Sequence, residues 1–138
     1  YHIAATLETL TANIYVNGSS IGSGAVLVPT ANAEPFRIGA NPSNSRYFDG
    51  KISLVRVWDT NLSAATIAAN MCNVYGTATT NMQGEWSLDD VYTDASGNGN
   101  TLTSSGSPVF VSDVPATCGG GAAGATRDAR MLSLLSVG

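Results

Sequence analysis

A glycine-rich turn carries the best candidates for a metal site in this chain of 138 residues. Asp94, Asn98 and Asn100 lie close together in the segment DASGNGN. Their carboxylate and amide oxygens, with backbone carbonyls of the turn, are the hard oxygen ligands that calcium prefers. Alternatively, Asp94, Ser96 and Asn98 only make the local Asx-type hydrogen bonds that shape the turn. The pattern therefore predicts either a calcium site or a turn held by its own side chains.

A second candidate site lies in a long polar loop. Tyr47 stands close in sequence to Asn44 and Arg46, so an aromatic ring is accompanied by amide and guanidinium groups. Such a ring, if exposed, offers an apolar face to a sugar while its polar neighbours bond the hydroxyls. The adjacent Phe48 is expected to anchor the loop on the core. We interpret this loop as a candidate glycan-binding surface.

Groups suited to catalysis are few. Glycoside hydrolysis needs two carboxylates that face one cleft, whereas the adjacent Asp89 and Asp90 point to opposite faces if they lie on a strand. His2 is the only histidine, so a nucleophile activated by histidine would depend on a residue in an expected terminal strand. We expect no enzymatic activity, no catalytic residue and no cofactor other than calcium.

The composition is that of a β-rich protein of the extracellular space. Charged residues make up 12% of the chain, and the net charge is -4. The six basic residues are scattered and form no stripe for phosphates, so a nucleic acid partner is not expected. No apolar run reaches the roughly 18 residues of a membrane span. Tyr1 begins the chain inside an expected strand, which predicts a processed chain or a piece of a longer protein.

The two cysteines, Cys72 and Cys118, have no metal-site or redox motif around them. A disulfide between them would close a loop of about 47 residues and add roughly 4 kcal/mol by loop entropy. Two free buried thiols are the alternative. For a secreted protein the disulfide is favoured.

Short strands and turns are expected along most of the chain. The dipeptide Asn17-Gly18 supplies the positive φ angles of a type I′ turn, which predicts a β-hairpin. Ser63 can cap a short helix near residues 63–71. The return strand of the hairpin is expected to contain Ile21 and to continue through residues 25–28. The other expected strands are residues 2–6, 12–16, 36–39, 51–58, 85–89, 101–103 and 108–111. The predicted fold class is all-β, an antiparallel β-sandwich with one short helix.

Several of these segments together resemble a known family. They are HIAAT at residues 2–6, IYVNG at 14–18, FRIG at 36–39, YFDGKI at 47–52, VRVW at 55–58 and LS at 62–63. In this order and spacing they resemble the laminin-G-like jelly rolls of the concanavalin A-like lectin and glucanase superfamily. The resemblance implies a jelly-roll sandwich, and members often hold calcium near the turn that matches residues 94–100.

The order of the matching parts is unusual. Residues 1–75 resemble the closing half of such a domain, while residues 83–113, with WSLD and DASGNG, resemble its opening strands. The central strands are missing. The chain is therefore one period of a tandem array, a circularly permuted sandwich, or a unit that shares strands with a neighbour. We expect one domain over residues 1–118, followed by a Gly/Ala linker and an apolar tail in residues 119–138.

A half-sandwich needs completion, because unpaired strand edges promote aggregation. We therefore predict a secreted or cell-surface structural or adhesive module, a repeat or filament subunit that assembles with itself. Its contacts would be open sheet edges and the apolar tail at residues 127–138, acting as a donor strand. The alternative is a carbohydrate-binding, lectin-like module, which rests on the superfamily alone.

Overall fold

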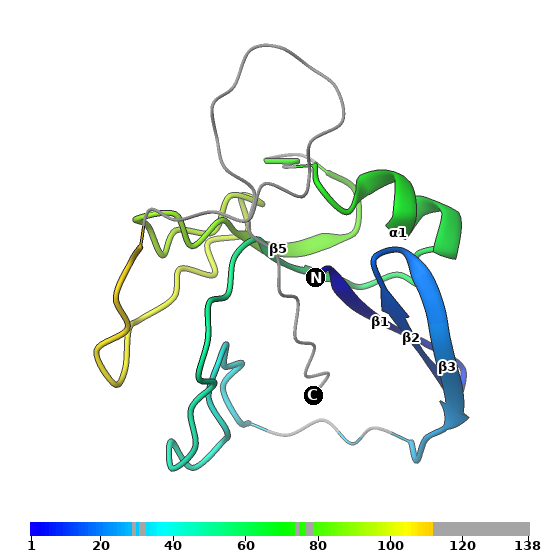
Figure 1. Ribbon diagram of the computed structural model, residues 1–138, viewed down its shortest axis with the longest axis horizontal. Coiled ribbons are helices and arrows are strands. Elements are labelled where there is room, and N and C mark those ends of the chain that lie inside the picture. The colour runs from blue at the N-terminus through cyan, green and yellow to red at the C-terminus, as the bar shows by residue number, and fades with distance from the viewer. Residues whose placement is uncertain (29, 31–32, 74, 77–78, 112–138) are drawn as a thin grey trace.

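The computed structural model describes residues 1–28, 30, 33–73, 75–76 and 79–111. In this part of the chain, two antiparallel sheets and one short helix form the regular structure (Figure 1). The predominance of antiparallel strands confirms the all-β prediction. The elements are β1 (Ile3–Glu8), β2 (Thr11–Val16), β3 (Ser19–Ala25), β4 (Val55–Trp58), α1 (Ala64–Asn70) and β5 (Met82–Trp86).

The first sheet has the strand order β1-β2-β3. Asn17 and Gly18 have φ angles of 49° and 77°, so the predicted hairpin turn is confirmed between β2 and β3. The strand that returns from this turn is β3, which contains Ile21 as expected and is otherwise mostly serine and glycine; it ends at Ala25 and does not continue through Val28. The two-residue turn sets the register of the hairpin, so pairing with β2 starts at Ser19. This pairing outweighs the low strand propensity of the glycines in β3.

The second sheet joins the two halves of the chain. β4 comes from the segment that resembles a closing half, and it pairs antiparallel with β5, which begins the other half. Val55 lies opposite Trp86, and both side chains are buried. Phe36 stacks on Trp86 with ring centroids 5.6 Å apart. A strand from the second half of the chain therefore pairs with a strand from the first half within the same chain.

Both strands of this sheet are shorter or shifted compared with the prediction. The expected strand at residues 51–58 starts only at Val55, because Leu54 adopts a φ of 50°, which a regular strand cannot contain. The strand expected at residues 85–89 ends at Trp86, since Leu88 has a φ of 55°. Residues 36–39, 101–103 and 108–111 form no strand. Positive φ angles, which the side-chain pattern does not reveal, set these ends.

The predicted helix is confirmed as α1. Ser63 is its N-cap, and its hydroxyl accepts a hydrogen bond of 3.1 Å from the backbone N–H of Thr66. Ile67 is the residue that the helix buries. The helix also contacts the hairpin turn, where Gly18 lies directly against Ala68. Within the described residues, no helix has the length and apolar character needed to cross a membrane.

Candidate functional site

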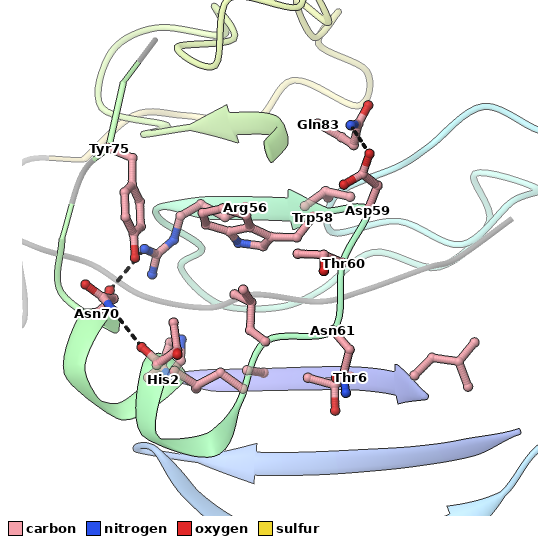
Figure 2. Close-up of a pocket in the computed structure, with 17 residues that line it drawn as sticks. His2, Thr6, Arg56, Trp58, Asp59, Thr60, Asn61, Asn70, Tyr75 and Gln83 are labelled. Atoms are coloured by element: carbon pink, nitrogen blue, oxygen red, sulfur yellow. Dashed lines mark hydrogen bonds between the residues drawn. The ribbon is translucent and has the colours of Figure 1, made fainter. Parts of the chain in front are cut away.

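A cavity of about 480 Å³ lies beside β1, between this strand and the segment that runs from β4 to α1 (Figure 2). Ala4 and Thr6 line it together with Ala5 and Leu7. Successive residues of a strand point to opposite faces of its sheet. Because residues from both faces of β1 line the cavity, the cavity lies along the edge of this strand. The other edge of β1 is hydrogen-bonded to β2. The cavity therefore occupies the place beside β1 where a further strand would lie.

Two buried polar groups at this cavity have no hydrogen-bond partner among the described residues. They are Nδ1 of His2 and Oγ1 of Thr6, whose residues are 7% and 8% exposed. Leaving a buried polar group unpaired costs about 1–3 kcal/mol. Burial, and then the charge of Arg56, lower the pKa of His2 to about 4, so the imidazole is neutral at pH 7. The cavity wall formed by β1 is uncharged and incompletely hydrogen-bonded.

The opposite wall is held by Arg56. Its guanidinium donates hydrogen bonds of 3.0 to 3.1 Å to the carbonyls of Asn70, Met71 and Asn73. These carbonyls lie at the C-terminal end of α1, where helix carbonyls lack partners within the helix. The guanidinium also lies 5.4 Å from the ring centroid of Tyr75. Figure 2 shows this side chain directed toward the helix end, so Arg56 fixes α1 to the second sheet.

A fully buried carboxylate stabilises the same region. Glu85 lies opposite Arg56 in the β4–β5 pair and is 0% exposed. Its Oε2 accepts a hydrogen bond of 3.0 Å from the N–H of Tyr75, and its Oε1 one of 2.9 Å from the N–H of Gly76. Sequence reasoning assigned no role to Glu85 or Arg56. The signal that links them is their opposite charge at facing positions, which becomes visible only when the register is known.

The three candidate calcium ligands are brought together, and all three hold their loop against β5. Asp94 accepts hydrogen bonds from the N–H groups of Glu85, Ser96 and Asn100, at 2.9 to 3.0 Å. The side-chain amides of Asn98 and Asn100 each donate 2.8 Å hydrogen bonds to carbonyls of β5. The bonds of Asp94 with Ser96 and Asn100 are local to the turn, whereas the others tie the turn to the backbone of β5. Calcium binding stays a prediction.

These hydrogen bonds also affect the acidity of Asp94. Burial acts to raise its pKa, but the hydrogen bonds from Glu85, Ser96 and Asn100 outweigh burial and lower the pKa below its ordinary value. Among the described residues, no group of three or more His, Cys, Asp or Glu side chains is placed to hold a metal ion. Oxygen ligands for calcium would have to come mainly from amides and carbonyls.

The candidate glycan loop exposes its aromatic rings. Tyr47 is 57% exposed, and Phe48, expected as a core anchor, is 48% exposed. Oδ1 of Asn41 accepts hydrogen bonds from the N–H groups of Ser45 and Arg46, so this side chain closes the turn over residues 41–46. Tyr47, Phe48 and Asn44 line a second cavity, of about 760 Å³, while Arg46 does not. Tyr47 and Asn44 are thus brought to one site, and glycan binding stays a prediction.

The predicted disulfide and the predicted tail cannot be placed. Cys72 follows α1 within the described part of the chain, whereas Cys118 lies outside the described residues. The tail at residues 127–138 and the linker before it lie outside them as well. The disulfide and the donor strand both stay predictions.

The comparison with family models decides the relationship of the first half. Residues 1–68 match a laminin-G-type model described as the concanavalin A-like lectin/glucanases superfamily. The similarity to that superfamily covers 68 of the 138 residues, just under half of the chain. The match confirms the resemblance over the stretch from β1 into α1, and the resemblance of residues 83–113 to opening strands stays a prediction. Searches of curated proteins and of solved structures find no significant match.

Proposed function

We propose that this laminin-G-like chain is an extracellular structural or adhesive module that assembles with neighbours through shared β-strands. The observation that carries the proposal is an incompletely covered apolar face of the first sheet. Facing pairs of β1 and β2 place six apolar side chains on one face: Ile3, Ala5, Leu7, Ala12, Ile14 and Val16. None of the six is buried, and Ile14 is 38% exposed.

The burial of this sheet is reversed from the usual order. Its other face carries Thr6 and Tyr15, which are the buried residues of β1 and β2. An antiparallel sheet normally turns its apolar face to the core and its polar face to water. Here two residues of the polar face are buried and none of the apolar face is, which favours a covering layer from elsewhere.

The apolar face continues over β3 as open space. Gly22 and Gly24 pair with Ile14 and Ala12, so they lie on the same face. A Cβ atom built on either glycine would meet nothing within 4 Å. Burying apolar area is worth about 25 cal/mol per Å², so covering this face would stabilise the module substantially. A strand layer supplied by a neighbour fits this requirement.

The cavity beside β1 is the second place for a shared strand. It borders an edge without a described partner strand, and two unpartnered polar atoms line it. The predicted donor is the apolar tail at residues 127–138. Since 27 residues follow Val111, an extended tail could reach up to about 90 Å, far enough for a neighbour's sheet. The proposal assigns no enzymatic activity to the chain.

Deletion of residues 127–138 tests the donor strand. We expect sedimentation velocity to show smaller species, while far-UV circular dichroism stays largely the same. A point variant, Leu134→Asp, should reproduce the loss, because it charges the apolar segment. Ala122→Asp adds the same charge outside that segment and serves as the matched control. Assembly that is unchanged by the deletion would reject the tail as donor.

The second candidate function is carbohydrate binding, favoured by the exposed ring of Tyr47 at the second cavity. Calcium dependence would come from Asp94, Asn98 and Asn100. A glycan array probed with and without calcium tests this candidate, with Tyr47→Ala expected to abolish binding and Tyr1→Ala as an exposed aromatic control. A chain that stays monomeric and binds glycans would replace the assembly proposal by this one.

A further inference from the structure

Strand β3 forms an outer edge of the first sheet (Figure 1). All seven of its residues are exposed, and Ile21 is 64% exposed. Among the described strands, β3 is hydrogen-bonded to β2 alone. An exposed edge offers a row of backbone N–H and C=O groups to any strand that can lie beside it.

The alternating hydrogen bonds between β2 and β3 identify the backbone groups of β3 that point away from β2. The N–H of Val26 donates a 2.8 Å hydrogen bond to the carbonyl of Leu10, so Val26 bonds toward β2. In an antiparallel pair, residues that bond across the ladder alternate with residues that do not. Ser23 and Ala25 are therefore the residues whose N–H and C=O groups point away from β2. Two residues of the edge are ready to bond a further strand.

This edge has few of the features by which proteins protect open edges. Such features include lysines, prolines, inward charges and bulges. Residues 9–33 contain no charged side chain, and the nearest proline, Pro29, lies beyond the strand. The β2–β3 pair has one register shift, opposite Ile14 and Tyr15, at the end of the pair near the hairpin turn. Residues 22–25 remain regular and uncharged.

We propose that β3 pairs antiparallel with β3 of a second copy of this chain, around a twofold axis near Ser23. The inference rests on the proposed function, since it names the edge by which one copy adds to another. A second copy is the occupant because its β3 is equally regular and uncharged. The chain carries a net charge of -4, which opposes self-association, but the uncharged residues 9–33 keep that charge away from this contact.

The steric requirements of this pairing are small. Serine and glycine make up most of β3, so two copies can approach without large side chains in conflict. A twofold axis near Ser23 lets each Ser23 exchange both backbone hydrogen bonds with its counterpart. The result is a continuous six-stranded sheet across two copies. Its apolar face would be twice the length of the face in one copy.

Sedimentation velocity over a concentration series tests the pairing. Ser23→Lys places two like charges opposite each other at the axis, and we expect the dimer dissociation constant to rise about fivefold or more. Ser23→Pro removes the outward N–H and should act in the same direction. Ser104→Lys, an exposed position outside both sheets, is the control and should leave association unchanged. Equal association of the wild type and both Ser23 variants would overturn the pairing.

Hydrogen exchange of the wild-type chain gives a readout that needs no variant. The amides of Ser23 and Ala25 should be protected at high protein concentration and should exchange fast on dilution. Protection that is independent of concentration would overturn the pairing. Association that survives Ser23→Lys but is lost on deletion of residues 127–138 overturns the β3 pairing and leaves the proposed function standing. A chain that is monomeric at every concentration overturns both.

Discussion

Replacement of the buried Glu85 by glutamine is the sharpest test of how the second sheet is stabilised. The two carboxylate oxygens accept one backbone N–H each, from Tyr75 and Gly76. Glutamine has nearly the same shape but only one acceptor oxygen. Its NH₂ group would face one of the two N–H groups, so a donor would oppose a donor in a site that is 0% exposed. The substitution removes hydrogen bonds while leaving packing almost unchanged.

The size of the effect follows from the contacts. A hydrogen bond to a charged group contributes about 1.5–3 kcal/mol, and an unpaired buried N–H adds a cost of its own. We expect Glu85→Gln to lower the free energy of unfolding by about 3 kcal/mol. With a denaturant slope of about 1–3 kcal/mol per molar urea, the midpoint should fall by about 1–3 M.

Urea unfolding followed by tryptophan fluorescence measures this shift, since Trp86 adjoins Glu85 and is buried. Glu8→Gln is the matched control, because Glu8 is exposed at the end of β1. Its midpoint should stay within about 0.5 kcal/mol of the wild type. If the two variants have the same midpoint, the hydrogen bonds to Glu85 contribute nothing and the reasoning is wrong.

Three further predictions concern acidity and backbone geometry. The pKa of His2 is lowered from 6.5 to about 4, so its contribution to the free energy of unfolding is complete above about pH 6.5 and is lost as the pH falls toward 4. The loss is up to about 3 kcal/mol. In His2→Gln, the urea midpoint should depend less on pH in this window. The lowered pKa of Asp94 stabilises the fold above its ordinary value of 3.8, and this contribution is lost at lower pH; Asp94→Ala should remove the acid dependence below pH 4 and lower the melting temperature. Gly18→Ala should cost more than Gly76→Ala in thermal melts, since both glycines have positive φ but only the Cβ at Gly18 would meet Ala68, at 2.7 Å; equal melting temperatures would contradict the packing of the turn on α1.

Local signals made part of the fold predictable. The Asn17-Gly18 turn and the Ser63 cap act over a few residues, so the hairpin and the helix follow from the sequence alone. Leu54 and Leu88 show where this reasoning failed. Both lie inside apolar patterns typical of strands, but both adopt positive φ angles that end the strands. Leucine is not a residue type that favours positive φ, so no signal in the sequence indicated these angles.

The candidate sites were predictable to a similar degree. The sequence brought Asp94, Asn98 and Asn100 into one turn, but it did not reveal that the backbone of β5 would be their hydrogen-bond partner. The roles of Arg56 and Glu85 depend on a strand register between distant segments. The half-exposed apolar face depends likewise on which strands are covered, a property of the whole fold.

Sedimentation velocity of the wild-type chain, measured from low to high micromolar concentration, tests the central claim most directly. An incompletely covered apolar face and an unprotected edge predict species larger than the monomer that grow with concentration. The shared-strand account predicts further that deletion of residues 127–138 reduces their size. A single monomeric species at every concentration would contradict assembly as the function of this chain.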